Sequence, residues 1–323
     1  MRFGRQLLML ACLCLMSPWL NASQCRGEGV ELQVLGSSGP ELAGNRASTS
    51  YLLRHDGDPR VLVDIGGGAA LRFGESGARV SDLELILLTH LHVDHSGDLP
   101  ALVKASYFQK RKRDLPVLGP DAGGPFPSTV NFLERLFAAN GAFAYLNDYL
   151  ASDKKAKTRN YQLRPQNVRT EEGEMQLVYD KRRVQVWGSS VSHGIVPAVA
   201  WRVDIGGVHV AFGGDTAAKG NNLEILARNA HMLVTHNAVP EGVSGVARTL
   251  HMPPSRIGEI AAAAKVDQLV LAHRMTRALG KEAQTQAAIR KAFSGPILFG
   301  EDLACYPVLP PPASAAGASA ATP

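Results

Sequence analysis

Short runs of branched and apolar residues alternate along most of the chain with Gly, Pro, Asn and Asp. Runs of this length predict β-strands, and the residues between them predict turns. The last run of the first half ends abruptly at Thr89 and His90, which is typical of a buried strand that delivers polar residues at its end. The strands expected in this half are Val30–Leu35, Thr49–Arg54, Arg60–Ile65 and Leu83–Leu88.

The same alternation returns in the second half of the chain, with helix-like segments between the strands. Two segments, Asn222–Arg228 and Ser255–Ala264, predict helices. Strands and helices mixed in two similar halves predict two sheets packed together with helices outside them. The strands expected in this half are Val184–Trp187, Ala198–Ile205, Val208–Phe212, Met232–Thr235 and Gln268–Ala272.

The stretch from about Lys104 to Asp180 has a different character, and we interpret it as an inserted cap over the site. It holds the basic cluster Lys110–Arg113, a Gly/Pro loop around 120–127, and a helix that begins after Ser128 as N-cap. The basic residues can steer anionic ligands, although a solvated polar face explains most of them. Further basic residues in this stretch are Lys154, Lys155, Lys157 and Arg159.

The N-terminus has the layout of a secretory signal. Two arginines precede the apolar stretch Leu7–Leu15, which breaks at Pro18 before small and polar residues. A buried helix or a membrane anchor is the alternative, but a spanning helix needs about 20 apolar residues. We assign residues 1–22 to the signal and expect an exported protein, periplasmic or secreted, with no stable membrane span after cleavage.

Composition excludes a disordered chain, because 45% of its 323 residues are hydrophobic and can bury a large core. We expect one catalytic domain over residues 23–306. Residues 307–323 are dominated by Pro, Ala, Ser and Gly, which predicts a disordered tail. The net charge of +5 is too weak to indicate nucleic acid by itself and is compatible with an anionic small substrate.

Removal of the leader would leave two cysteines, Cys25 and Cys305, near the ends of the domain. An oxidising compartment would favour a disulfide between them, which would tie the terminal segments together. Two unrelated free thiols are the alternative, and the sequence leaves both open.

Four potential metal ligands, His90, His92, Asp94 and His95, lie in one short loop directly after a buried strand. Imidazole and carboxylate suit zinc, and manganese or iron fit mixed His and Asp ligands nearly as well. A solvated surface loop is the alternative, but the preceding buried strand argues against it. Further candidates that follow strand-like runs are His193, Asp215 and His273.

In this order the motifs resemble the metallo-β-lactamase superfamily, which has a His-x-His-x-Asp-His loop followed by His, Asp and His. The resemblance spans about Val30 to Arg274 and implies an αββα four-layer sandwich with two zinc ions at the edge of its sheets. It also implies that Asp64 supports the site as an outer group that orients ligands. The implied ligands are His90, His92 and His193 for the first zinc, Asp94, His95 and His273 for the second, and Asp215 as the bridge.

Aspartate at position 215 argues against the β-lactam-hydrolysing branches, which have Cys or Ser there. The segment that begins at His251 resembles the end of the ribonuclease Z, arylsulfatase and phosphodiesterase branch, in which this histidine helps to bind or protonate the phosphoryl group. The sequence departs from ribonuclease Z at Asn237, where that pattern has Glu. His236 ends a strand but matches no ligand position, so we expect a structural role for it.

The resemblance therefore predicts a di-zinc hydrolase in which a metal-held hydroxide attacks a phosphodiester or a similar anionic ester. Asp94 would orient that hydroxide and His251 would assist the leaving group. Arylsulfatase, lactonase and β-lactam hydrolase activities are alternatives, and a non-catalytic metal-containing binding protein is an alternative of another class. Because a leader speaks against cytoplasmic tRNA, we expect a small anionic ester as substrate and no nucleic acid. The oligomeric state is left open.

Overall fold

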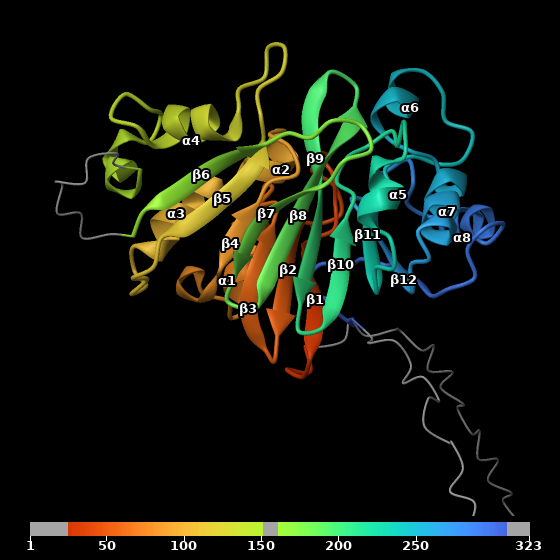
Figure 1. Cartoon of the computed structure of the whole chain (residues 1–323), viewed down its shortest axis with the longest axis horizontal. Coiled ribbons are helices and arrows are strands. Elements are labelled where there is room, and N and C mark those ends of the chain that lie inside the picture. The colour runs from red at the N-terminus through yellow and green to blue at the C-terminus, as the bar shows by residue number, and fades with distance from the viewer. Residues whose placement is uncertain (1–24, 151–160, 309–323) are drawn as a thin grey trace, which may run out of the picture.

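The computed structural model describes residues 25–150 and 161–308. Two seven-stranded sheets pack face to face, and helices cover the outer face of each sheet (Figure 1). This arrangement confirms the predicted αββα four-layer sandwich. The expected signal at 1–22 and the basic residues Lys154, Lys155, Lys157 and Arg159 lie outside the described residues.

The first sheet has the order β14-β1-β2-β3-β4-β5-β6, and β3 to β6 run parallel. Helices α1, α3 and α4 pack on its outer face over an apolar cluster that includes Phe73, Leu102 and Phe137. The strands are β1 Val30–Gly36, β2 Ser50–His55, β3 Asp58–Val63, β4 Leu85–Leu87, β5 Leu115–Pro120, β6 Leu163–Val168 and β14 Cys305–Pro307. The helices on this side are α1 Ala69–Glu75, η1 Val80–Asp82, α2 Val93–Ser96, α3 Leu99–Ser106, α4 Thr129–Phe137 and η2 Ala144–Tyr149.

The second sheet has the order β13-β12-β11-β10-β9-β8-β7, with β10 to β13 parallel and the rest antiparallel. Its outer face packs on a second apolar cluster with Leu226, Ile257 and Ile289 from the covering helices. The strands are β7 Gln176–Lys181, β8 Val184–His193, β9 Val196–Ile205, β10 Val208–Phe212, β11 Met232–His236, β12 Gln268–Ala272 and β13 Ile297–Phe299. The helices are α5 Asn222–Leu226, α6 Val246–Leu250, α7 Pro254–Ala263 and α8 Glu282–Ile289.

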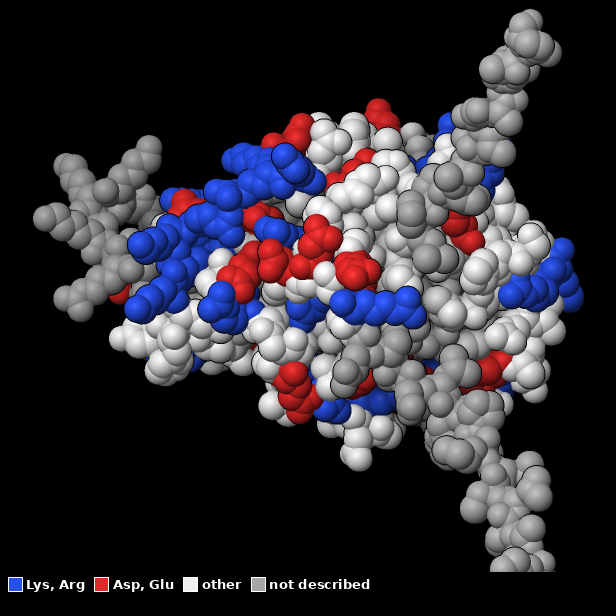
Figure 2. All heavy atoms as spheres, turned by 90° about the horizontal axis from the view of Figure 1, so that it is seen from below, with Lys and Arg blue, Asp and Glu red and all other residues white. Residues whose placement is uncertain are grey.

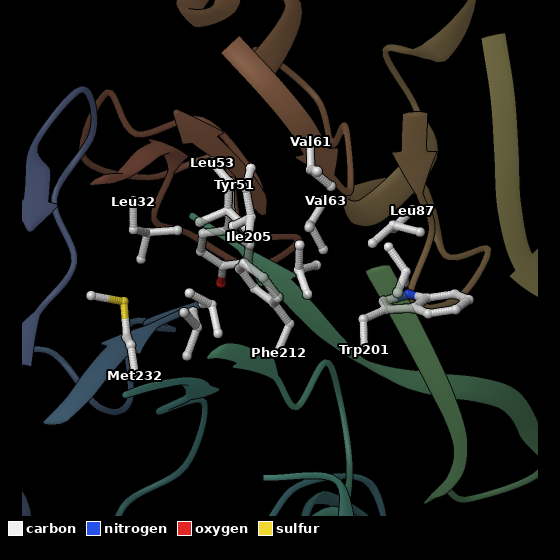
Figure 3. Close-up of a cluster of buried hydrophobic side chains, with 14 of the residues drawn as sticks. Leu32, Tyr51, Leu53, Val61, Val63, Leu87, Trp201, Ile205, Phe212 and Met232 are labelled. Carbon is white, nitrogen blue, oxygen red and sulfur yellow. The ribbon is translucent and has the colours of Figure 1, made fainter. Parts of the chain in front are cut away.

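The main core lies between the two sheets. Figure 3 shows Tyr51 and Leu87 of the first sheet facing Phe212 and Trp201 of the second. Each such side chain, when fully buried, stabilises the fold by about 1.5–3 kcal/mol before entropy is counted. The indole nitrogen of Trp201 donates a hydrogen bond to the backbone oxygen of Leu88 at 3.2 Å, so its one polar atom is also satisfied. This rigid interface fixes where the strands of both sheets end.

Two of the expected domain boundaries need correction. The range 104–180 contributes β5, β6 and β7 to the two sheets, so it is not a separate cap. Ser128 does cap α4, because its hydroxyl accepts a hydrogen bond from the amide of Asn131. The expected tail begins too early, since Pro307 ends β14 and Val308 is buried in the core.

Cys25 and Cys305 form a disulfide, with their α-carbons 5.1 Å apart. The bond joins the segment before β1 to strand β14, which pairs with β1 at the margin of the first sheet. The question that the sequence left open is thereby answered. None of the helices in the described ranges is long and apolar enough to cross a bilayer.

Candidate metal centre

The candidate ligands meet at one edge of the sandwich, where several strands of both sheets end. Four of them follow β4, two in the loop before α2 and two within α2, which is labelled in Figure 1. His193 is the last residue of β8, while Asp215 and His273 come just after β10 and β12. Because the carboxyl ends of parallel strands lie at the same edge of a sheet, residues distant in sequence converge there. We call this set of residues the metal edge.

His90, His92, His193 and Asp215 form the first group, whose ligand atoms lie within 4.8 Å of one another. His90 Nε2 is 3.0 Å from His92 Nδ1, and His193 Nε2 is 3.6 Å from Asp215 Oδ2. His193 Nδ1 donates to the backbone oxygen of Leu250 at 2.9 Å, so its Nε2 carries no proton when the ring is neutral. The structure thus brings together the residues implied for the first zinc.

The second group holds His95, His236, His273 and again Asp215, and Asp94 lies beside it. His95 Nε2 is 3.5 Å from Asp94 Oδ2, and His273 Nε2 is 3.6 Å from Asp215 Oδ1. The Nδ1 atom of His273 lies 2.7 Å from the hydroxyl of Thr49, which fixes the orientation of the ring. Asp215 therefore stands between the two groups, at the position that the resemblance assigned to the bridge.

The donor atoms fit a metal. His95 Nε2 and His193 Nε2 are buried without a hydrogen-bond partner among the described residues, although leaving a buried polar atom unpaired costs about 1–3 kcal/mol. In both residues the other ring nitrogen is held by a carboxylate or a carbonyl, which is the arrangement found around metal-binding histidines. The cluster can therefore bind metal; the role of each ligand stays a prediction.

Electrostatics favour a neutral His90 and an ionised Asp215, but they favour a protonated His95. Burial, followed by the charge of His95, holds the pKa of His90 well below its usual value. Burial opposes ionisation of Asp215, but His273 and the neighbouring imidazoles outweigh it and hold its pKa well below the usual range. Burial also lowers the pKa of His95, yet Asp64 outweighs that effect and raises it to about 9. A metal must therefore displace a proton from His95, which makes metal binding depend on pH.

Asp64 supports the site as the resemblance implies. Its carboxylate accepts hydrogen bonds from the amide and the hydroxyl of Thr89, both at 2.7 Å, and from His95 Nδ1 at 2.8 Å. The adjoining chain passes very close to the ligand loop, because a Cβ at Gly66 would lie 2.1 Å from the backbone oxygen of Asp94. Glycine is required there, and the strand end that carries Asp64 can approach the ligands only for that reason.

His251 also reaches the metal edge. Its Nδ1 lies 3.8 Å from Asp215 Oδ1 and has no hydrogen-bond partner in the part of the chain that the structure describes. Its ring centre is 5.6 Å from that of His193. Burial, opposed by Asp215, lowers the pKa of His251 to about 4. The side chain is therefore neutral near pH 7 in the metal-free protein and close enough to act on a bound ligand.

Sequence reasoning underestimated His236. Its Nδ1 contacts the carboxylate of Asp215, its Nε2 is 3.2 Å from the hydroxyl of Tyr51, and its ring stacks on His273 at 4.5 Å. It also belongs to the second group of potential ligand atoms. Since both of its nitrogens have protein partners, we interpret His236 as a residue that holds Asp215 in place. Its position at the end of β11, between β10 and β12, was the signal that could have placed it here.

The basic cluster Lys110–Arg113 does not reach the metal edge. It precedes β5, whose other end at Pro120 is the one that points toward the ligands. Arg111 is buried and donates to the backbone oxygens of Val80 and Leu83, while Arg113 pairs with Glu84 at 3.1 Å. The suggestion that this cluster belongs to a cap over the site is therefore wrong, because β5 separates the two.

Comparison with known proteins agrees with this geometry. The profile of the Metallo-beta-lactamase superfamily matches residues 43–257. A Ribonuclease Z of Mycobacterium avium is 29% identical over 294 residues, which cover 85% of this chain and 96% of that protein. Among solved structures, the metallo-beta-lactamase fold protein YhfI from Bacillus subtilis has a TM-score of 0.66 at 19% identity, covering 86% of this chain and 98% of its own. Human tRNase Z, short form, has a TM-score of 0.66 at 17% identity and covers 86% of this chain and 99% of its own.

These relatives correct one expectation. The sequence predicted a small anionic ester as substrate and excluded nucleic acid, but the curated relatives matched over almost their whole length are ribonucleases by name. The exclusion rested on the apparent leader and on one departure at Asn237, and neither feature outweighs similarity along 85% of the chain. The superfamily profile, the two groups of ligands and the four-layer fold together make this chain a metal-dependent hydrolase of the metallo-β-lactamase superfamily.

Proposed function

We propose that the protein is an exported di-zinc phosphodiesterase and that RNA is among its substrates. The observation that carries the proposal is the pair of ligand groups that share Asp215, since two adjacent metals suit the in-line displacement of a phosphodiester. Similarity to ribonuclease Z along most of the chain supports RNA as a substrate. When bound, zinc supplies a water that is activated near neutral pH and stabilises negative charge on the phosphoryl group.

The side chains of the chain orient this chemistry. Asp94 and Asp215 present carboxylate oxygens to the space between the histidine Nε2 atoms and can fix the direction of an attacking water. The free Nδ1 of His251 faces the same space and can bind a phosphoryl oxygen or assist the leaving oxygen. Strand ends fix all three residues before substrate arrives, so little ordering is needed during the reaction.

Asn237 makes the site differ from that of ribonuclease Z. It is buried, and within residues 25–150 and 161–308 neither its carboxamide oxygen nor its carboxamide nitrogen has a hydrogen-bond partner. Along β11, Met232 and Val234 face the other sheet, whereas Leu233 faces the covering helices. Because side chains alternate along a strand, Asn237, which directly follows β11, is expected on the same side as Leu233. His251, which precedes α7, lies on that side as well. An amide there can donate and accept hydrogen bonds but brings no charge to His251. We infer that Asn237 contributes to substrate selection.

Export is supported by the Cys25–Cys305 disulfide, because such bonds persist in oxidising compartments and are rare in the cytosol. Cell fractionation of the full-length chain, followed by thiol labelling with and without a reductant, tests this part of the proposal. We expect the protein outside the cytoplasm with both cysteines blocked. Recovery in the cytoplasm with reactive thiols would contradict it.

The enzymatic proposal is tested by metal analysis followed by a substrate panel. We expect about two zinc ions per chain, and turnover of bis-p-nitrophenyl phosphate and of an RNA oligonucleotide but not of p-nitrophenyl sulfate or a lactone. Asp94→Ala should lower turnover of bis-p-nitrophenyl phosphate by more than about 100-fold, a larger loss than the removal of a supporting residue typically causes. The control is Asp180→Ala, an exposed carboxylate at the end of β7 remote from the ligands. Full metal content without turnover of any ester would favour a binding protein instead.

A further inference from the structure

Cationic side chains gather on the side of the molecule opposite the metal edge, and Figure 2 shows them as a blue band on the left of the view from below. The residues lie in the loop before β5 and in the turn between β7 and β8. Strand β8 runs from Val184 beside this turn to His193 at the metal edge, so the two regions are about 30 Å apart. We call this set the cationic track; it consists of Arg79, Lys110, Lys112, Arg113, Lys181 and Arg182.

The track is concave. One hollow of about 520 Å³ is lined by Arg79, Lys110, Lys112 and the ring of Phe108. A second hollow of about 530 Å³ is lined by Lys181 and Arg182, and Arg113 lines both. The two hollows therefore adjoin at this residue.

The positive charge of the track is only partly neutralised. No described carboxylate lies within ion-pair distance of Lys110, Lys112 or Lys181. Glu84 is shared by three arginines, with Arg113 at 3.1 Å among them. The other carboxylates in the lining are Asp82 and Asp114, which pair with Arg79 and Arg164, and Asp180, which accepts from Gln185.

Three aromatic side chains lie beside the track, two of them just after α3 and one in η2. Tyr107, Phe108 and Tyr145 are 59%, 78% and 68% exposed, which is unusual for rings of this size. The ammonium group of Lys104 lies 4.6 Å from the ring centre of Tyr107, 5.5 Å from that of Phe108 and 5.8 Å from that of Tyr145. Phe108 also lines the first hollow, so an aromatic platform adjoins the free lysines.

We propose that the cationic track and its aromatic platform bind single-stranded nucleic acid, with phosphates on the lysines and bases stacked on the rings. Unpaired cations beside exposed rings are the combination with which proteins hold single strands independently of sequence. Concave hollows fit a flexible polymer, whereas a flat anionic bilayer cannot enter them. The choice of RNA as the polymer rests on the proposed function. An RNA strand long enough to span the distance from the cationic track to the metal edge would be bound by the track at one point while another part of it lies at the metal edge.

Binding of a labelled oligouridylate of about 20 nucleotides, measured by fluorescence anisotropy at several salt concentrations, tests the inference. The double substitution Lys110→Glu with Lys112→Glu should weaken binding at least about tenfold. It should also reduce the slope of log Kd against log salt by about 1.4, because each of the two lost phosphate contacts contributes about 0.7 to that slope. Phe108→Ala should weaken binding about five- to 100-fold, the loss of one stacked base, and leave the salt slope unchanged. The matched control is Lys281→Glu with Lys291→Glu, two exposed lysines at the ends of α8.

Turnover of bis-p-nitrophenyl phosphate separates this inference from the proposed function. It should be unchanged in all of these variants, because the dye ester is too small to reach the track. Track-dependent RNA binding without any ester turnover would support the inference and contradict the proposed function. Unchanged RNA affinity in the lysine and Phe108 variants would overturn the inference. Binding to phosphatidylglycerol vesicles is measured in parallel, and variants that lose vesicle binding but keep their RNA affinity would also overturn it.

Discussion

The two ends of the sandwich use polar residues in opposite ways. At the metal edge His90, His95 and His273 are buried, and neighbours fix the ring orientation of each. On the cationic track the lysines are exposed and have no assigned partner among the described residues. The first arrangement makes every residue depend on the others, whereas the second distributes a weak attraction over many groups. Substitutions should therefore act cooperatively and severely at one end, and gradually and additively at the other.

The largest effect is expected from Asp215→Ala, because this carboxylate belongs to both ligand groups. Loss of the shared ligand should abolish binding of at least one metal and lower the turnover of bis-p-nitrophenyl phosphate by more than about 100-fold. Metal analysis by mass spectrometry and steady-state kinetics provide the measurements. Asp180→Ala again serves as control. Two tightly bound metals and normal turnover in Asp215→Ala would show that the two groups do not depend on one another.

Much of this edge could be predicted from sequence. The ligand residues follow apolar runs that end abruptly, and strand ends of that kind meet at one edge in any sandwich of parallel strands. A structural role was expected for His236, but its partner could not be predicted, because only the pairing of β11 with β10 and β12 places it beside Asp215. Asp64 was found because its motif was recognised, but its three hydrogen bonds depend on a close backbone approach at Gly66.

The other end could not be predicted in the same way. Strand β5 contains Pro116 and Pro120, and β6 alternates with exposed polar residues, so neither carries the apolar run of a central strand. The range was therefore taken for a cap, and its basic cluster was placed over the site. Arg113 and Arg182 are far apart in sequence and meet at Glu84 only because β5 and β7 belong to sheets that face each other. Such non-local contacts leave no periodic signal in the chain.

An intermediate effect is expected from Asp64→Asn, which keeps the shape of the side chain but removes an acceptor. The carboxylate accepts from His95 and twice from Thr89, and an amide cannot accept with its nitrogen. The orientation and basicity of His95 should suffer, so zinc affinity should fall about 10- to 100-fold. Titration with a competing chelator measures that affinity, with Asp180→Asn as control. An unchanged zinc affinity would mean that Thr89 and the local packing orient His95 without a charged partner.

The smallest effect is expected from Lys181→Ala on the cationic track. Its ammonium group has no assigned carboxylate partner, so its removal costs the folded protein little and leaves the ester chemistry about 30 Å away unchanged. RNA affinity should fall only about two- to fivefold, uniformly across sequences, with the salt slope lower by about 0.7. Anisotropy titrations of Lys181→Ala, with Lys281→Ala for comparison, resolve a change of this size. Combined with Lys110→Ala the losses should add, because separate phosphate contacts do not depend on one another. A much larger loss from the single substitution would mean that this end is as cooperative as the metal edge, and the contrast between them would fail.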